Sequence, residues 1–206
     1  MYKKYIYLIG SLIRNPTLKK HSLFLKESNN WSLENLQNYQ LKKLKDIINY
    51  SYEKSSFYFS YYNENDFHPS QIKTLKDLKK IPIIKKQDLI NNNTDIHTRI
   101  CGKTFKSSTS GSSGQSLSFF RDEHADSFNR ASVQRGYSWY NIYPWQRNGY
   151  FWGFNFSFFS KIKISFLDFL QNRFRVFSYE KNNLENFIKK ISKAKYIHSY
   201  SSMIYQ

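Results

Sequence analysis

The segment Ser107–Phe120 reads "SSTSGSSGQSLSFF", and the interpretation of the whole chain starts from it. Two of only seven glycines, Gly111 and Gly114, stand three residues apart in this segment, among hydroxyl side chains. Glycine permits positive φ and has no Cβ to obstruct a ligand. A loop of this composition can direct several backbone N–H groups into one concavity that binds anions. We therefore predict a Gly/Ser loop between two strands, "KTFKS" and "SLSFF".

The hydroxyl groups beside the two glycines add hydrogen-bond donors, and together they suit the phosphates of a nucleotide. The candidate phosphate-binding residues are Thr109, Ser110, Gly111, Ser112, Ser113 and Gly114. No lysine follows Gly114, so this is not the GxxxxGK[ST] loop of nucleotide hydrolases, and no G-x-S-x-G elbow is present. Ser/Gly-rich hairpin loops are common, so a purely structural turn remains an alternative.

Downstream of the loop, strand and helix patterns alternate. A helix is expected over 123–143, with Ala131 and Val133 among the residues of its inward face. An aromatic strand or buried segment is expected over 148–159, and a strand over 173–179. A helix over 182–194 and a strand over 195–202 follow, and this alternation predicts an α/β fold. The sequence ends at "MIYQ", where the next helix is expected, so we expect the domain to be truncated.

Upstream of the loop the patterns are mainly helical. A long amphipathic helix is expected over 30–62 with Ser32 as its N-cap, ending near Ser55. Thr74 is expected to cap a short helix that Pro82 stops, and a second short helix precedes a loop over 91–96. We predict a helical N-terminal segment over 1–80 and an incomplete α/β nucleotide-binding subdomain over 81–206.

The chain is strongly basic, with a formal charge of +17 over 206 residues. Such a balance suits nucleic acid, an anionic membrane surface or a polyanionic substrate. The lysines are scattered rather than gathered into a stripe, which disfavours nucleic acid. A non-catalytic basic module that binds a polyanion, either nucleic acid or an anionic membrane surface, is the alternative function.

The N-terminal apolar run Tyr5–Ile13 is too short to cross a bilayer, which needs about 20 residues, and it lacks a signal-peptide cleavage site. We interpret it as an ordinary helix packed on the domain, with a weak membrane-surface anchor as the alternative. The single cysteine, Cys101, fits a reducing compartment. The expected location is the cytoplasm, with at most peripheral membrane association.

The sequence does not favour a metal site, an acid–base pair or an acyl pocket. The five histidines show no metal-ligand spacing, so no metal site is predicted. His124 and Asp126 could form an acid–base pair, but a solvated helix start is the preferred interpretation. The aromatic run over 149–159 is interpreted as core rather than as the lining of an acyl pocket.

The loop, in the order "STSGSSGQSLSF", resembles the phosphate-binding motif of the adenylate-forming (AMP-binding) enzymes. The surroundings are similar to one family, the phenylacetate–CoA ligase-like proteins, and to its branch found with capsular polysaccharide genes (CapK-type). The matching pieces are "WSLENLQNYQLKKLKDIINYSYEKSSFYFSYY", "LKDLKKIPIIKKQDLINN", "YSWYNIYPWQRNGYFWG" and "FSYEKNNLENFIKKISKAKYIHSYSSMIYQ".

The resemblance implies part of a large N-terminal domain from a two-step ligase that uses ATP, Mg2+ and often coenzyme A. A carboxylate attacks the α-phosphate of ATP, and a thiol then takes the acyl group. The loop residues would hold the β- and γ-phosphates by electrostatic stabilisation and positioning. No catalytic residue is assigned.

The chain also departs from the family pattern. The later adenine, ribose, hinge and catalytic-lysine motifs are missing, as is a proline after the loop. "WQRNG" replaces a Gly-Asp pair, and "IHSYSS" replaces Gly-Tyr-Pro-Ser. Whether this chain is itself an enzyme is therefore left open, and we expect negligible ATP–pyrophosphate exchange from it alone.

Overall fold

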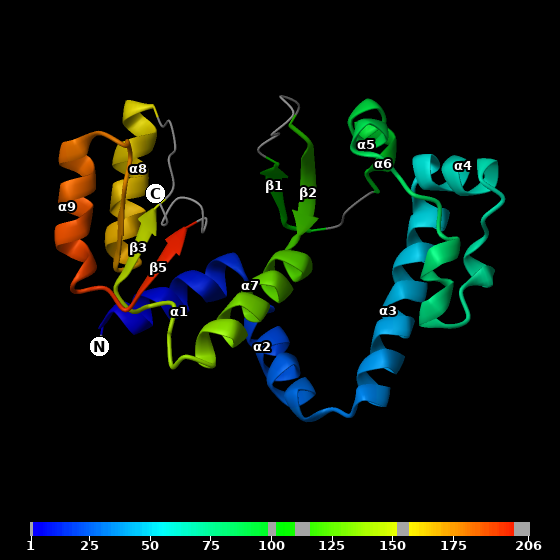
Figure 1. Cartoon of the computed structure of the whole chain (residues 1–206), viewed down its shortest axis with the longest axis horizontal. Helices are drawn as coiled ribbons and strands as arrows, with labels where there is room; N and C mark the ends of the chain where they lie inside the picture. The colour runs from blue at the N-terminus through cyan, green and yellow to red at the C-terminus, as the bar shows by residue number, and fades with distance from the viewer. Residues whose placement is uncertain (1, 99–101, 110–115, 152–156, 200–206) are drawn as a thin grey trace. The chain divides into compact units, whose positions relative to one another are not determined.

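The computed structural model describes residues 2–98, 102–109, 116–151 and 157–199, which divide into two compact units. Unit 1 comprises Met1–Ser22 and Asn129–Gln206, and unit 2 comprises Leu23–Phe128. Helices α2 (Leu18–Glu27) and α7 (Glu123–Ser138) pass from one unit into the other. Figure 1 labels the elements, and each unit is described separately below.

The long helix of unit 2 is α3 (Leu33–Lys54), and it begins and ends as predicted. The Ser32 Oγ accepts a hydrogen bond from the Asn35 N–H (3.2 Å), which caps the helix. Ser55 ends α3 and caps α4 (Ser56–Glu64). One side of this pair packs into a cluster of Ile48, Tyr62, Phe67 and Ile72. Burial raises the pKa of Tyr62 to about 12, as expected for a phenol removed from water.

Capping residues close in sequence determine where the next short helices begin. The 3-10 helix η3 (Leu75–Lys80) starts at Thr74, whose N–H donates to the Asp77 carboxylate (2.7 Å). The hydrogen bonds from Lys80 and from the Thr74 backbone hold the pKa of Asp77 well below its usual range. Helix α5 (Lys86–Asn91) is the predicted second short helix. The prediction of a loop over 91–96 was wrong, because α6 (Asn93–Ile96) forms one further helical turn there.

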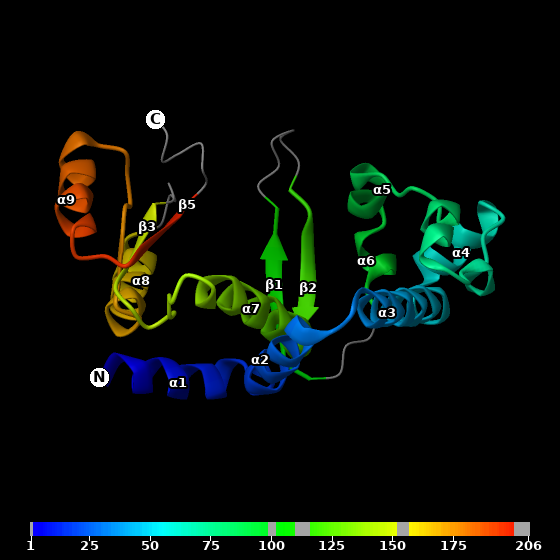
Figure 2. The same ribbon diagram turned by 60° about the horizontal axis from the view of Figure 1, so that its bottom comes forward.

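The predicted strand–loop–strand segment forms a β-hairpin in unit 2. Strands β1 (Thr104–Ser108) and β2 (Ser118–Asp122) run antiparallel, with Thr104 opposite Asp122 and Ser108 opposite Ser118. Figures 1 and 2 show the two arrows pointing in opposite directions. The ladder is regular over all five residues of each strand.

Unit 1 contains a three-stranded parallel sheet in the order β4–β3–β5. These strands are β3 (Asn148–Phe151), β4 (Arg173–Arg175) and β5 (Tyr196–Ser199), connected by α8 (Phe158–Leu170) and α9 (Lys181–Ile191). Phe174, Val176 and Phe187 form the apolar core beneath α9. The predicted α/β fold is confirmed, since parallel strands alternate with crossover helices.

Two details of unit 1 differ from the sequence prediction. Phe158 and Phe159, expected in a buried segment, begin the exposed helix α8 and are 72% and 83% accessible. Val133, expected on the inward face of α7, is exposed, whereas Ala131 on the same helix is buried. Both errors come from taking apolar side chains as buried when tertiary packing leaves them at the surface.

Candidate functional site

Three hydrogen bonds join Thr109 to Ser116 and Leu117, the described residues on either side of the predicted phosphate loop. The Thr109 N–H donates to the Leu117 carbonyl (2.9 Å), and the Leu117 N–H donates to the Thr109 Oγ1 (3.1 Å). The Ser116 hydroxyl donates to the Thr109 carbonyl (2.7 Å). The other five candidate residues, 110–114, lie outside the described residues. The structure thus defines the hairpin and the first residue of the loop. The Thr109 N–H is already hydrogen-bonded to the Leu117 carbonyl.

A second candidate region is the edge of the unit 1 sheet where the strands end. In open α/β sheets, ligands bind beyond the carboxyl ends of the parallel strands. Strands β3 and β5 end side by side here, and the Ser199 hydroxyl donates to the Phe151 carbonyl (2.6 Å). Residues 152–156 and 200–206, which continue from these strands, lie outside the described residues.

Beside this edge lies an aromatic cluster that contains a histidine. The ring of His198 on β5 stacks on Tyr150 of β3, with 4.9 Å between centroids. A hydrogen bond joins His198 Nδ1 to the Tyr137 hydroxyl of α7 (2.7 Å). Burial, followed by the positive charge of Arg173, lowers the pKa of His198 below 6.5. His198 is therefore neutral at neutral pH and serves as a hydrogen-bonding group.

The lowered pKa of His198 predicts that acid destabilises unit 1. Both folded and unfolded chains carry a neutral His198 above its unfolded pKa of 6.5, so stability is fully present there. As the pH falls through 6.5 towards the folded pKa, the unfolded chain binds the proton first and the free energy of unfolding drops. Urea denaturation at about pH 8 and about pH 5 should show this drop, and it should be smaller in His198→Gln. Equal drops in both proteins would contradict the assignment.

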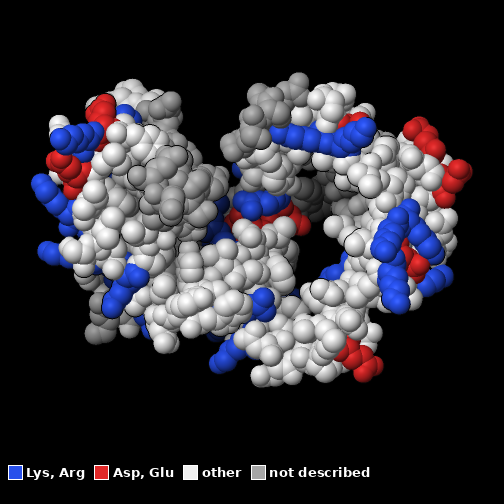
Figure 3. All heavy atoms as spheres, viewed as in Figure 1, with Lys and Arg blue, Asp and Glu red and all other residues white. Residues whose placement is uncertain are grey.

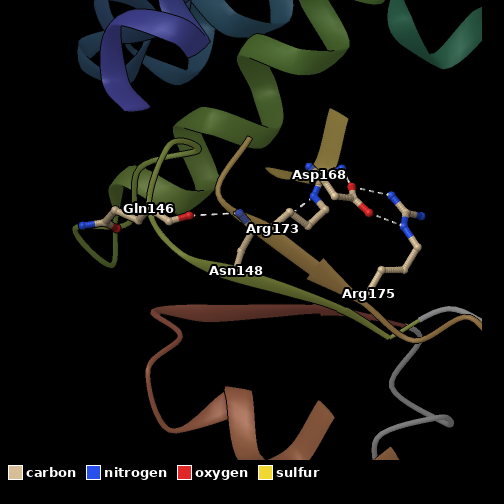
Figure 4. A network of polar contacts seen from close by, with 5 residues as sticks. All are labelled: Gln146, Asn148, Asp168, Arg173 and Arg175. Atoms are coloured by element: carbon tan, nitrogen blue, oxygen red, sulfur yellow. Dashed lines mark hydrogen bonds and ion pairs between the residues drawn. The ribbon is translucent and has the colours of Figure 1, made fainter. Parts of the chain in front are cut away.

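Figure 4 shows a network of polar side chains along β3 and β4. The Asp168 carboxylate on α8 accepts two hydrogen bonds from Arg175, from Nε (2.8 Å) and Nη2 (2.9 Å). Arg173 Nη1 lies 3.7 Å from Asp168 Oδ1, and Arg173 Nε donates to the Asn148 side-chain oxygen (3.1 Å). The Asn148 amide donates to the Gln146 carbonyl (2.9 Å). These groups satisfy one another, so the network positions the strands rather than performing chemistry.

A cavity of about 490 Å3 lies in unit 1 on the side of α1 (Tyr2–Arg14). Its polar lining includes Tyr7, Arg14, Arg130 and Arg173, with leucines from α8 on the opposite wall. Burial raises the pKa of Tyr7, so its hydroxyl keeps its proton. Three arginines give the cavity a positive potential.

The start of α7 is solvated only in part, because His124 is exposed whereas Asp126 is buried. Asp126 is 1% exposed and forms an ion pair with Arg121 of β2, at 3.0 Å from Nη2 to Oδ1. Glu123 is also buried and accepts a hydrogen bond from Ser127. The predicted solvated helix start is therefore wrong for Asp126, which forms an ion pair with a cation of the hairpin strand, whereas His124 is exposed as predicted. No group of three metal-ligating side chains occurs within the described ranges.

Comparison with solved structures identifies the fold. A structure of 2-hydroxyisobutyryl-CoA ligase in an open conformation, in complex with 2-HIB-AMP and CoA, matches with a TM-score of 0.58 and 21% identity. The chain shares its fold with part of this ligase. The match covers 82% of this chain and 38% of the ligase. The same ligase in the postadenylation state, in complex with R3-HIB-AMP, matches with a TM-score of 0.54 and 20% identity over 76% of this chain and 34% of the ligase.

The match spans little more than a third of the ligase, so the activity of a whole ligase is a matter for proposal. No family model matches the sequence, and no curated protein matches it significantly. Sequence analysis did not anticipate the His198 cluster or the Asp168 network. A signal for the network was present, since Arg173 and Arg175 alternate with Phe174 and so share one face of a strand.

Proposed function

We propose that the chain is the N-terminal part of an ATP-dependent carboxylate-adenylating enzyme of the acyl-CoA ligase type. One observation supports the proposal: a chain with the fold of part of a CoA ligase has two antiparallel strands, β1 and β2, immediately before and after its Ser/Gly-rich segment in sequence. The finer assignment, to phenylacetate–CoA ligase-like proteins of the capsular polysaccharide branch, rests on the sequence motifs alone.

In this proposal the Gly/Ser loop holds the β- and γ-phosphates of ATP. Backbone N–H groups of 110–114 donate to the phosphate oxygens, while Thr109 contributes its hydroxyl because its N–H is bonded to Leu117. The carboxylate substrate attacks the α-phosphorus, the bond to the bridging oxygen breaks, and pyrophosphate leaves with its charge stabilised by the loop. A thiol such as that of CoA then displaces AMP. Mg2+ would neutralise phosphate charge, and no residue of this chain is assigned to it.

Replacing Gly111 and Gly114 with valine should weaken ATP binding at least tenfold, or by about 1.4 kcal/mol. Valine disfavours the positive φ that glycine allows and places methyl groups where phosphate approaches. Binding is measured by titrating a fluorescent ATP analogue. Gly136→Ala serves as the control, because an added Cβ meets nothing within 4 Å there.

The same titration separates the proposal from the polyanion-binding alternative. If nucleotide binding persists in the double valine variant and falls steeply with salt, the contact is a non-specific charge effect. Within each unit, the basic side chains seen in Figure 3 have acidic ones among them and form no continuous stripe on the face shown. This arrangement favours the nucleotide loop over a nucleic-acid surface.

A further inference from the structure

The cavity of about 490 Å3 beside α1 brings together positive charges from three elements of unit 1. Arg14 comes from α1, Arg130 from α7 and Arg173 from β4. Among the described residues that line the cavity there is no aspartate or glutamate. A recess with three cations and no carboxylate in its wall attracts an anion. Arg173 is the first residue of β4, so this part of the wall lies at the amino-terminal end of the strand and not at the carboxyl edge described above.

Helix α1 turns polar side chains towards this cavity. Tyr7, Ser11 and Arg14 all line it, and their spacing of four and three residues places them on one face of the helix. Six other large side chains of α1 form an apolar arc that faces outward, between 39% and 73% exposed. They are Tyr2, Tyr5, Leu8, Ile9, Leu12 and Ile13. A surface helix normally buries such an arc, whereas α1 places hydrogen-bonding groups in the cavity wall.

The donors of the cavity lie close together and are held in place. Burial raises the pKa of Tyr7, and the nearby positive charges of Arg130 and Arg173 act on the same phenol. The Tyr7 hydroxyl accepts a hydrogen bond from the Gln134 side chain (2.7 Å), so its own O–H serves as a donor. The Arg173 guanidinium carbon lies 3.6 Å from the centre of the Tyr150 ring. Such fixed donors bind an anion at a low cost in conformational entropy.

The remaining wall of the cavity is partly apolar. Leu167 and Leu170 of α8 line it, together with Leu18 of α2. Ligand sites typically have volumes of about 300–1,000 Å3, with apolar walls and a few placed polar groups that orient the ligand. The cavity therefore suits a small organic anion that carries an apolar group.

We propose that this cavity binds a small organic phosphate monoester, with the phosphate at the arginines and the apolar group against the leucines. Asp168 Oδ1 lies 3.7 Å from Arg173 Nη1 and offsets part of its charge, which leaves about two positive charges for the ligand. A phosphate monoester carries a charge of about −1.5 to −2 near pH 7, whereas a carboxylate carries only one negative charge. Guanidinium groups also bind phosphate oxygens in a bidentate geometry. The cavity belongs to unit 1 and the Gly/Ser loop to unit 2, so this site is additional to the proposed ATP site.

Isothermal titration calorimetry of the full chain with phenyl phosphate tests this proposal. At pH 7.5 and 0.15 M salt we expect a dissociation constant below about 1 mM. At this ionic strength the scattered surface lysines attract the ligand only weakly, because their charges are screened beyond about 8 Å. Inorganic phosphate lacks the apolar group, and benzoate carries the smaller charge. Each should bind roughly tenfold more weakly than phenyl phosphate.

Arg14→Gln should weaken the binding of phenyl phosphate by about tenfold, because it removes one charge-assisted donor from the cavity wall. Arg14 is exposed, so an unchanged urea midpoint will show that this variant folds. The matched control is Lys4→Gln, which removes the same charge from an exposed position of α1 that does not line the cavity. It should leave the affinity unchanged.

Four outcomes would overturn the proposal. They are no binding of phenyl phosphate, equal binding by wild type and Arg14→Gln, an equal loss in Lys4→Gln, and benzoate binding as tight as that of phenyl phosphate. If the variant with valine at Gly111 and Gly114 loses phenyl phosphate while Arg14→Gln keeps it, the phosphate binds at the Gly/Ser loop instead. That result would refute the cavity site and leave the proposed ATP loop intact, so the two proposals can fail separately.

Discussion

Replacing Asp168 with alanine should lower the free energy of unfolding of unit 1 by about 3–5 kcal/mol. Asp168 is 5% exposed and accepts two hydrogen bonds from Arg175, with Arg173 close by. Its removal leaves two arginines in a poorly solvated site without their anion, and breaking a buried pair in this way costs more than the pair contributes. Urea denaturation followed by circular dichroism measures the change.

A solvent-exposed ion pair provides the control. Lys43 and Asp46 lie 3.4 Å apart on α3 with both side chains more than half exposed, so Asp46→Ala should change stability by less than about 1 kcal/mol. Changing Asp168 to leucine together with both arginines to methionine should cost less than the single alanine change, because no buried charge is left unpaired. A loss below about 1 kcal/mol for Asp168→Ala would show that water reaches the arginines.

The elements that could be predicted from sequence are those fixed by nearby residues. Ser32 caps α3 and Thr74 starts η3 through contacts with residues only three positions away. The alternation of Arg173, Phe174 and Arg175 gives β4 its two different faces. Such signals depend on the side-chain period of a helix or strand and on short-range hydrogen bonds. They can therefore be recognised without knowledge of the tertiary structure.

What could not be predicted depends on partners distant in sequence. His198 meets Tyr137 across 61 residues. The outward apolar arc of α1 has the same period as a buried one, so periodicity does not reveal which face of this helix meets the protein. Helix α8 was not predicted from the sequence. For the candidate site, the sequence alone predicted which segment of the chain forms the loop. The pairing register of strands β1 and β2 required the structure.

Gly149→Ala should lower the free energy of unfolding of unit 1 by about 1–3 kcal/mol, and Gly149→Val by more. A Cβ at Gly149 would lie 2.9 Å from Phe187 Cζ and 3.0 Å from Phe174 Cε2. Both rings are buried and packed together, with 4.9 Å between centroids, so neither can move aside freely. Alanine normally improves on glycine in a strand by about 0.5–1 kcal/mol, and the clash outweighs that gain.

Gly10→Ala is the matched control, because it makes the same chemical change where a Cβ meets nothing within 4 Å. Gly10 lies inside α1, so this variant should be more stable by about 0.5–1 kcal/mol. Adding Phe187→Leu to Gly149→Ala should cost less than the sum of the two single changes, since the shorter side chain vacates the space that Cβ needs. Strict additivity of the pair, or a Gly149→Ala variant as stable as wild type, would contradict the close contact between β3 and α9.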